Sequence, residues 1–261
     1  MKKVLSAFAA VIMAAAVCAG CSSVKPNEVF SVADLTGKTI GVQLGTTGDI
    51  YAEDEVEDAK IERYKSGADA VQALKQGKVD AVIIDNEPAK VFVSKNSDLK
   101  ILDEEFITEE YAIAIKKGNT ELTDAINTAL VELKADGTMD TIAANWIGDE
   151  KGSHPYVSPE GIEYPNGTLI MATNAQFPPY ELVENGEVVG FDVDMMRAVC
   201  DKLGYQLEIE NMDFDSIITA VSSGKAHVGA AGMTVTEDRL KNIDFSDSYT
   251  TATQVIIVRA K

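Results

Sequence analysis

Two residues that could contact a small ligand occupy equivalent places in two similar stretches of the sequence. Asp85 and Gly232 each lie eight residues beyond the glycine of a Gly-Lys pair, Gly77 in one stretch and Gly224 in the other, after a helical segment and an apolar strand. Open α/β sheets bind ligands beyond the carboxyl ends of their strands. We therefore expect both positions to contact a ligand, although helix-Gly-strand units are common and Asp85 could instead cap the segment before Pro88.

The sequence has no arrangement typical of catalysis or of metal binding. His154 lies in a glycine- and proline-rich stretch and His227 near the end of an expected strand, so neither joins a serine, cysteine or zinc constellation. The three cysteines show no C-x-x-C spacing, and the turn at 45–48 lacks the lysine of a phosphate-binding loop. We expect a protein without enzymatic activity, metal or cofactor.

The composition is that of an acidic globular protein. Its 261 residues are 46% hydrophobic and 25% charged, with only 7 prolines, which excludes disordered and low-complexity classes. With 23 basic and 42 acidic residues the formal charge is −19, so the field of the protein would repel phosphate backbones. Nucleic acid is excluded as an expected partner.

The beginning of the chain resembles a bacterial export signal. Lys2 and Lys3 precede an apolar run of about fourteen residues at 4–17, whereas a membrane-spanning helix needs roughly twenty. Small residues before Cys21 resemble a lipobox, so we expect residues 1–20 to be a lipoprotein signal peptide and Cys21 to carry the lipid. The alternative is ordinary secretory cleavage near Ala19.

Alternating strands and helices must position the candidate ligand contacts. Apolar, β-branched runs predict strands, and amphipathic spacing predicts helices. This alternation is typical of parallel sheets flanked by helices, and two such sheets facing each other would form a cleft. The expected strands are 38–44, 79–84, 169–173, 206–210 and 226–230, and the expected helices are 68–76, 122–134, 139–146, 193–203 and 214–222.

Several motifs resemble one family of bacterial binding proteins. The segment Gly190–Cys200 resembles the signature of extracytoplasmic solute-binding proteins for polar amino acids, the capture components of ABC importers. The resemblance implies an α/β protein with a two-lobed, periplasmic-binding-protein-like fold of type II, each lobe being a sheet flanked by helices. Further motifs that carry it lie at 172–181, 212–215, 231–239 and 243–247, and in the first half at 37–47, 80–85 and 136–146.

The order of these motifs departs from that of the family. Members usually begin with the segment found here at 167–259 and end with the one found at 30–146, so the chain resembles a circularly permuted member. The stretch 149–165 would be a linker that joins the family's usual termini. Domain termini often lie close together at the surface, which makes such a rearrangement tolerable.

The family resemblance also predicts how the chain divides between the lobes. One lobe would hold residues 37–113, and the second would hold 114–148 and 166–258. Residues 21–36 would be a tether that also supplies a hinge segment. We expect the strand at 111–117 to be the one covalent crossing between the lobes, with residues 28–32 pairing noncovalently beside 252–258.

The resemblance implies how the carboxylate of an L-amino acid would be bound. Arg239 matches the arginine that grips the α-carboxylate through its planar guanidinium. Thr234 and the backbone amides around Thr46 and Thr47 would share that carboxylate. Without the motif, Arg239 could be a surface residue paired with a neighbouring acid, and the threonines could simply cap the following helix.

The remaining ligand groups are assigned in the same way. Asp85 would bind the α-ammonium, helped by the Gly232 carbonyl, and Phe177 and Phe214 would sandwich the ligand side chain, although an isolated phenylalanine is more often part of a core.

Two amides complete the expected site. Asn174 stands where relatives that bind cationic or amide side chains often have an aspartate, and an amide supplies no negative charge, so basic ligands are disfavoured. Gln43 would add a further polar contact.

We therefore expect a lipid-anchored, monomeric receptor on the outer face of the bacterial membrane. It would close over one polar L-amino acid and deliver it to the permease of an ABC importer, because ligand bridging the lobes favours the closed state. One alternative is a periplasmic cyclohexadienyl or arogenate-type dehydratase on the same fold, which would need a general acid in the cleft. Another is an amino-acid sensor that serves a separate membrane receptor.

Overall fold

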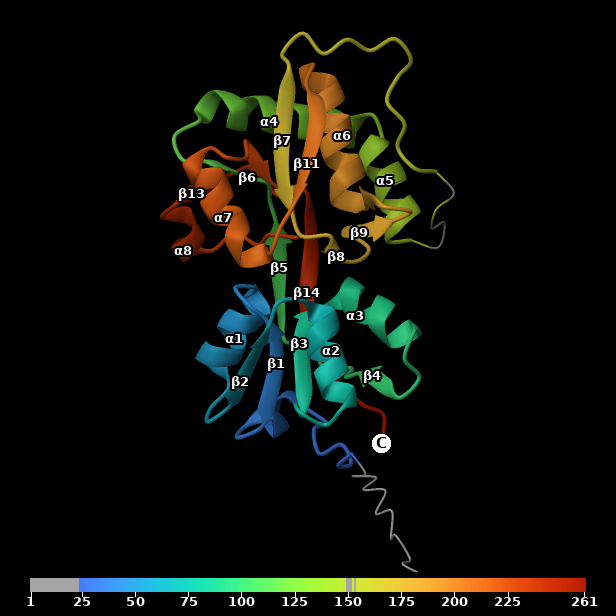
Figure 1. Cartoon of the computed structure of the whole chain (residues 1–261), viewed down its shortest axis with the longest axis vertical. Helices are drawn as coiled ribbons and strands as arrows, with labels where there is room; N and C mark the ends of the chain where they lie inside the picture. The colour runs from blue at the N-terminus through green and yellow to red at the C-terminus, as the bar shows by residue number, and fades with distance from the viewer. Residues whose placement is uncertain (1–23, 149–151, 153) are drawn as a thin grey trace, which may run out of the picture.

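The computed structural model describes residues 24–148, 152 and 154–261, which form two α/β lobes connected by long strands (Figure 1). The expected signal peptide and Cys21 lie outside these residues, as do positions 149–151 and 153 of the expected linker. Among the described helices, none is long and apolar enough to cross a membrane.

The first lobe is a mixed sheet in the strand order β2-β1-β3-β14-β4, with β5 pairing to β14. β1 and β3 are buried along almost their whole length because helices cover the sheet, which is why β3 reads as an apolar run up to Asp85. The elements are η1 (Val32–Leu35), β1 (Thr39–Gln43), α1 (Thr47–Glu55), β2 (Lys60–Tyr64), α2 (Gly67–Lys75), β3 (Ala81–Asp85), α3 (Asn86–Ser94), β4 (Leu99–Ile101), β5 (Ile107–Tyr111) and β14 (Thr250–Arg259).

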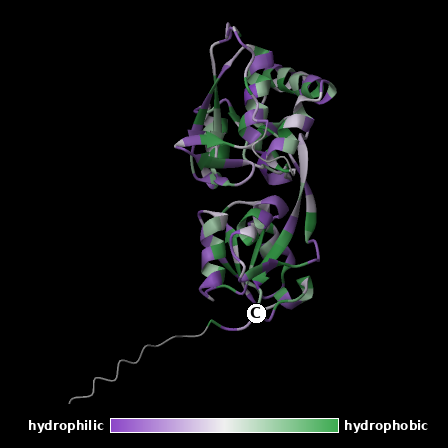
Figure 2. Ribbon diagram, turned by 90° about the vertical axis from the view of Figure 1, so that its right-hand side faces the viewer, coloured by the Kyte–Doolittle hydropathy of each residue, from purple (hydrophilic) through white to green (hydrophobic). Residues whose placement is uncertain are grey.

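The second lobe repeats this arrangement in the order β11-β7-β12-β6-β13, with a small three-stranded sheet, β10-β9-β8, beside it. Figure 2 shows apolar ribbon gathered inside each lobe and polar ribbon outside. The elements are β6 (Ala114–Lys116), α4 (Thr120–Ala135), α5 (Thr138–Trp146), β7 (Thr168–Thr173), β8 (Gln176–Phe177), β9 (Glu181–Glu184), β10 (Glu187–Val189), α6 (Phe191–Leu203), β11 (Gln206–Asn211), α7 (Phe214–Ser223), β12 (Val228–Gly229), α8 (Glu237–Leu240) and β13 (Ile243–Phe245).

Two strands connect the lobes, which corrects the expectation of one covalent crossing (Figure 1). β5 leads from the first lobe into β6 of the second sheet, while β14 runs antiparallel to β5 and continues into the first sheet between β3 and β4. Each sheet therefore gains one antiparallel strand, β14 or β6, rather than being wholly parallel. Residues 254–258 consequently belong to the first lobe and not, as the sequence suggested, to the second.

The segment expected to supply a hinge near residues 28–32 forms no strand with β14. The amide N of Asn27 donates a hydrogen bond to the carbonyl O of Lys261 (2.9 Å), and Val29 is buried in the same apolar cluster as Val258. This segment closes the base of the first lobe. The hinge is the β5–β14 pair.

The end of the linker is attached to the second lobe. The hydroxyls of Tyr156 and Tyr164 donate to the two carboxylate oxygens of Asp201 on α6 (2.9 and 3.0 Å), and the backbone N–H of Asn166 donates to the Gly204 carbonyl (3.0 Å). Residues 154–167 therefore lie along α6 rather than extending freely.

Candidate functional site between the lobes

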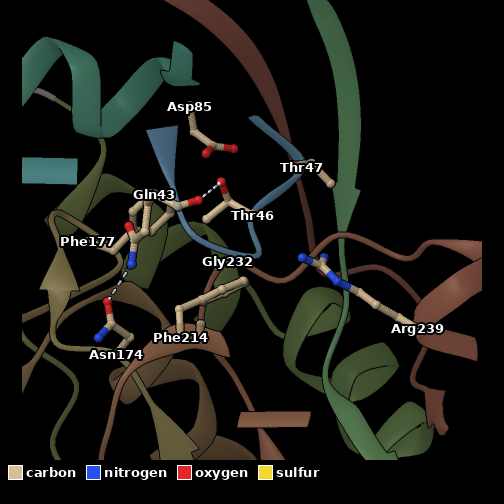
Figure 3. Close-up of a pocket in the computed structure, with 10 residues that line it drawn as sticks. Gln43, Thr46, Thr47, Asp85, Asn174, Phe177, Phe214, Gly232 and Arg239 are labelled. Atoms are coloured by element: carbon tan, nitrogen blue, oxygen red, sulfur yellow. Dashed lines mark hydrogen bonds between the residues drawn. The ribbon is translucent and has the colours of Figure 1, made fainter. Parts of the chain in front are cut away.

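A pocket between the lobes brings together nine of the ten residues that the sequence singled out (Figure 3). The cavity left among their side chains is about 10 Å³, the space that roughly one water molecule needs. The lobes must therefore move apart to admit a larger ligand. The predicted residues that line the pocket are Gln43, Thr46, Thr47, Asp85, Asn174, Phe177, Phe214, Gly232 and Arg239.

Arg239 lies at one side of this pocket and links the two lobes. It is 5% exposed, so it is not the surface arginine of the alternative interpretation, and Asp238 pairs instead with Lys241. Its Nη1 donates to the carbonyl O of Thr234 (2.6 Å), and its Nη2 donates to the carbonyl O of Gly45 in the first lobe (2.9 Å). Burial lowers the pKa of Arg239, while the charges of Glu109 and Asp85 act in the opposite direction. The guanidinium is a buried donor suited to a carboxylate.

The three predicted threonines use their hydroxyls differently, and only Thr46 and Thr47 line the pocket. Thr46 caps α1, accepting from the Asp49 amide (3.4 Å), as the capping alternative predicted. Thr47 is the first residue of α1, where a backbone N–H has no partner within the helix and favours an anion. Thr234 does not line the pocket directly, but its carbonyl holds Arg239. We call Arg239, Thr47 and Thr234 the arginine end.

Glu109 on β5 is a buried carboxylate at the arginine end that the sequence did not single out. Its Oε2 accepts hydrogen bonds from Thr47 Oγ1 (2.9 Å), Thr234 Oγ1 (3.0 Å) and Gln254 Nε2 (3.1 Å). These donors come from the first lobe, the second lobe and the hinge strand β14, respectively. Glu109 is thus a junction between both lobes and the hinge.

Asp85 ends β3 and points into the pocket with its carboxylate almost wholly buried, at 4% exposure. It precedes α3 but makes no side-chain capping hydrogen bond, so the capping alternative does not describe it. It accepts a hydrogen bond from the hydroxyl of Tyr111. Burial, and then the charge of Glu109, raise the pKa of Asp85 to about 7. A ligand cation beside it would favour the ionised carboxylate.

Gly232 lies in the turn after β12, where its conformation and surroundings exclude a side chain. Its φ is +52°, and a Cβ there would lie 2.7 Å from Cε1 of Phe177 and 3.1 Å from Cε2 of Tyr111. The Gly232 amide donates to Asp192 Oδ2 (2.8 Å), which also accepts from the Tyr249 hydroxyl (2.8 Å). This buried carboxylate therefore fixes the turn that faces the pocket.

Phe177 and Phe214 form apolar walls from the second lobe. Phe177 is 6% exposed and stacks on Tyr180, with ring centroids 5.7 Å apart, while Phe214 is 8% exposed and lies 5.5 Å below the guanidinium carbon of Arg239. Both rings face the pocket as well as the core, so they are lining residues that also support the fold.

Gln43 and Asn174 meet on the other side of the pocket from Arg239 (Figure 3), and we call this pair the amide end. Gln43 Nε2 donates to Asn174 Oδ1 (3.0 Å), which joins the first lobe to the second. Asn174 Nδ2 donates to the Met212 carbonyl (2.8 Å), and Gln43 Oε1 accepts from the Gly67 amide (3.2 Å).

Glu109, Tyr111 and Gln254 contribute to the site without having been predicted. Glu109 and Tyr111 lie on β5 and Gln254 lies on β14, whereas the sequence predicted a crossing between the lobes only at 111–117 and placed Gln254 in the second lobe. The signal available in the sequence was an acid two residues before an aromatic residue, beside the crossing predicted at 111–117. In the part of the chain that the structure describes, no group of three or more histidine, cysteine, aspartate or glutamate side chains could hold a metal ion.

Comparison with known proteins identifies the class to which this fold and site belong. The family model for bacterial extracellular solute-binding proteins, family 3, matches residues 24–149 and 169–261, so the chain belongs to that family. This agrees with the predicted two-lobed α/β fold and with a binding protein rather than an enzyme.

Individual relatives match over shorter stretches. The arginine-binding extracellular protein ArtP of Bacillus subtilis is 43% identical over 100 residues, which is 38% of this chain and 39% of ArtP. The L-cystine-binding protein TcyJ of Escherichia coli is 34% identical over 127 residues, which is 48% of each chain. A crystal structure of a mutant of ArgBP from T. maritima is 38% identical, covering 50% of this chain and 55% of that one, with a TM-score of 0.43. The chain thus spans about half or less of the length of these curated relatives.

Proposed function

We propose that this protein captures one polar L-amino acid between its lobes and delivers it to the permease of an ABC importer. The single observation that carries the proposal is the pairing of a buried arginine and a buried aspartate across one interlobe pocket. Arg239 is suited to the α-carboxylate and Asp85 to the α-ammonium, and each comes from a different lobe. The names of the relatives, which include arginine and L-cystine binding, agree with an amino acid as the ligand class.

The arrangement also supports closure that depends on the ligand. A ligand held by Arg239 and Asp85 touches both lobes, so it binds the closed state more tightly than the open one. Gly45 and Thr47 of the first lobe already adjoin Arg239 and Thr234 of the second. The small cavity implies that release requires the lobes to separate around the β5–β14 hinge.

The proposed location is the outer face of the bacterial membrane, with Cys21 as the lipid attachment site and a single copy as the working unit. Cys21 itself is outside the described residues, and the chain enters the first lobe at its base, far from the pocket (Figure 1). Replacing Cys21 with serine is expected to move the protein from the detergent-extracted membrane fraction to the soluble fraction. Membrane retention of the serine variant would contradict the anchor.

We further propose that the chain is a circularly permuted family member. Two observations support this: the family match is interrupted at 150–168, and the Asn27 and Lys261 backbones lie within hydrogen-bonding distance. A rearranged chain that begins at residue 166, joins Lys261 to Asn27 and ends at residue 148 is expected to fold and to bind the same ligand. Failure of that chain to fold would count against the permutation.

Thermal unfolding of the protein from Ser22 onward, measured with each L-amino acid, its D-form and prephenate, tests the proposed function. A ligand at a hundred times its dissociation constant adds about 2.7 kcal/mol of stability. A stereospecific shift with one or a few L-amino acids is the expected result. If no amino acid shifts the unfolding temperature and the protein turns over prephenate, the dehydratase is favoured instead.

A further inference from the structure

The amide end of the pocket is a neutral site, and this bears on which amino acid the protein takes. Gln43 and Asn174 are 4% and 1% exposed, and both line the pocket on the other side from Arg239 (Figure 3). A ligand whose α-carboxylate lies on Arg239 and whose side chain passes between Phe177 and Phe214 would reach this pair. The polar groups of the pair therefore meet the tip of the ligand side chain.

Backbone partners fix which way both amides point. Asn174 must direct its NH₂ to the Met212 carbonyl, because a carbonyl only accepts, and this leaves its oxygen toward Gln43. Gln43 must direct its oxygen to the Gly67 amide, because an N–H only donates, and this leaves its NH₂ toward Asn174. Neither amide can be flipped without losing a backbone hydrogen bond.

After these contacts each amide keeps one N–H and one lone pair, and the two groups that adjoin the Gln43–Asn174 hydrogen bond are a donor and an acceptor. Gln43 Nε2 has a second N–H, since it gives one to Asn174, and Asn174 Oδ1 has a second lone pair. An adjacent donor and acceptor complement a primary carboxamide, which offers a C=O and an NH₂ in the same plane. An apolar side-chain tip would leave both groups without partners.

Among the residues that the structure describes, no charged group at the amide end would balance an ionic side chain. Asp85 accepts a hydrogen bond from Tyr111. Glu109 accepts hydrogen bonds from Thr47 and Thr234 at the arginine end. Neither carboxylate is hydrogen-bonded to the Gln43–Asn174 pair. Asp213 follows Met212 but is 41% exposed and pairs with Lys65. A guanidinium, ammonium or carboxylate placed between Gln43 and Asn174 would be buried without a counter-ion.

We infer that the ligand is an L-amino acid with a carboxamide side chain, the class of glutamine and asparagine, and that the Gln43–Asn174 pair selects it. This inference rests on the proposed function, since it takes the α-amino and α-carboxylate contacts from that proposal.

Titration calorimetry with L-glutamine, L-asparagine, L-arginine, L-lysine, L-glutamate and L-methionine tests the inference on the unmodified protein. The expected result is that one of the two carboxamides binds at least about tenfold more tightly than every ionic or apolar ligand, a difference of about 1.4 kcal/mol. Tighter binding of arginine, lysine, glutamate or methionine would overturn the inference but leave the proposed function standing. If no amino acid binds, the proposed function fails, and this inference fails with it.

Asn174→Asp provides an independent test, because it places a carboxylate where the neutral oxygen stands. The ratio of glutamine to arginine affinity is expected to fall by about tenfold or more relative to the unmodified protein. The matched control is Asn127→Asp on α4, where the oxygen that accepts from the Asp247 amide is retained. An unchanged ratio in a folded Asn174→Asp protein would overturn the inference. If that variant does not fold, the order of ligand affinities of the unmodified protein tests the inference instead.

Discussion

Arg239 of the second lobe donates a hydrogen bond from Nη2 to the carbonyl oxygen of Gly45 in the first lobe, at 2.9 Å. The guanidinium therefore already spans the interlobe gap at the place where a ligand carboxylate is expected. A carboxylate is a stronger acceptor for a guanidinium than a backbone carbonyl, because the hydrogen bond then joins two opposite charges. Ligand binding would replace a weak link between the lobes with a stronger one.

Replacing Arg239 with alanine should abolish tight binding of the amino acid. Each hydrogen bond to a charged group contributes about 1.5–3 kcal/mol, so loss of a two-pronged contact should weaken binding by about a hundredfold or more. Arg239→Lys should give an intermediate loss, because lysine keeps the charge but not the planar fork. Titration calorimetry measures both, with the exposed Lys241→Ala as the control. Unchanged affinity in Arg239→Ala would show that Arg239 does not bind the ligand.

Ligand binding should depend on pH through Asp85. The pKa of Asp85 is raised from its usual 3.8 to about 7 in the folded protein. Between these two pH values the carboxyl is therefore protonated in the folded protein but ionised in the unfolded chain, and the bound proton stabilises the folded state. This stabilising contribution is complete below about pH 4 and is lost as the pH rises through about 7. The ligand ammonium favours the ionised form, so binding should release a proton and weaken by up to about tenfold per pH unit below 7.

Calorimetry in two buffers of different ionisation enthalpy counts the released protons. Asp85→Asn should bind weakly at all pH values and show no proton release linked to this group. A wild-type protein whose affinity is the same from pH 5 to pH 8 would contradict the assignment of the raised pKa to the ligand site.

Removing the Glu109 carboxylate should loosen the closed arrangement in the absence of ligand. Glu109→Ala leaves Thr47, Thr234 and Gln254 without their shared acceptor, which should cost roughly 1–3 kcal/mol of the free energy of unfolding. Small-angle X-ray scattering should show a larger radius of gyration for the ligand-free variant. The neighbouring Glu110 is exposed on the same strand, so Glu110→Ala is the matched control. Equal stability and equal dimensions in the two variants would show that Glu109 does not hold the lobes together.

A methyl group at Gly232 should displace the Phe177 wall. Gly232→Ala places its Cβ 2.7 Å from a ring carbon of Phe177, and its positive φ adds backbone strain. We expect at least about tenfold weaker binding, together with a loss of roughly 1–3 kcal/mol in stability. Gly186 also has a positive φ but has no atom within 4 Å of the added Cβ, so Gly186→Ala separates strain from steric conflict. Similar binding by the two variants would mean that the Gly232 contact with Phe177 is not needed.

The elements that carry Asp85 and Gly232 could be predicted from the sequence because buried strands and helices leave strong periodic patterns. β3 reads as an apolar run ending in an acid, and α7 buries one face, with Ile217 and Val221 inside. α1 could not be predicted in this way, because its residues are mostly polar and show almost no amphipathic pattern. It forms because Thr46 caps it and because it packs on β1.

The hinge could not be predicted correctly because strand pairing between distant segments leaves little local signal. In β14 only Val255–Val258 form an apolar run, and only the pairing of the strand with β3, β4 and β5 assigns its second half to the first lobe. The same limitation hid Glu109, whose partners are distant in sequence and come from both lobes. Nine of the ten residues named from the family motifs line the pocket and Thr234 does not, while their roles toward a ligand stay predictions.

The central claim is that the pocket recognises the α-carboxylate through Arg239 and the α-ammonium through Asp85. Titration calorimetry with the tightest-binding L-amino acid and with two analogues, one lacking the carboxylate and one lacking the amine, tests it most directly. We predict that each analogue binds at least about a hundredfold more weakly than the intact amino acid, because each leaves a buried charge without its partner. If either analogue binds as tightly as the amino acid, the residue assigned to the missing group does not recognise that group.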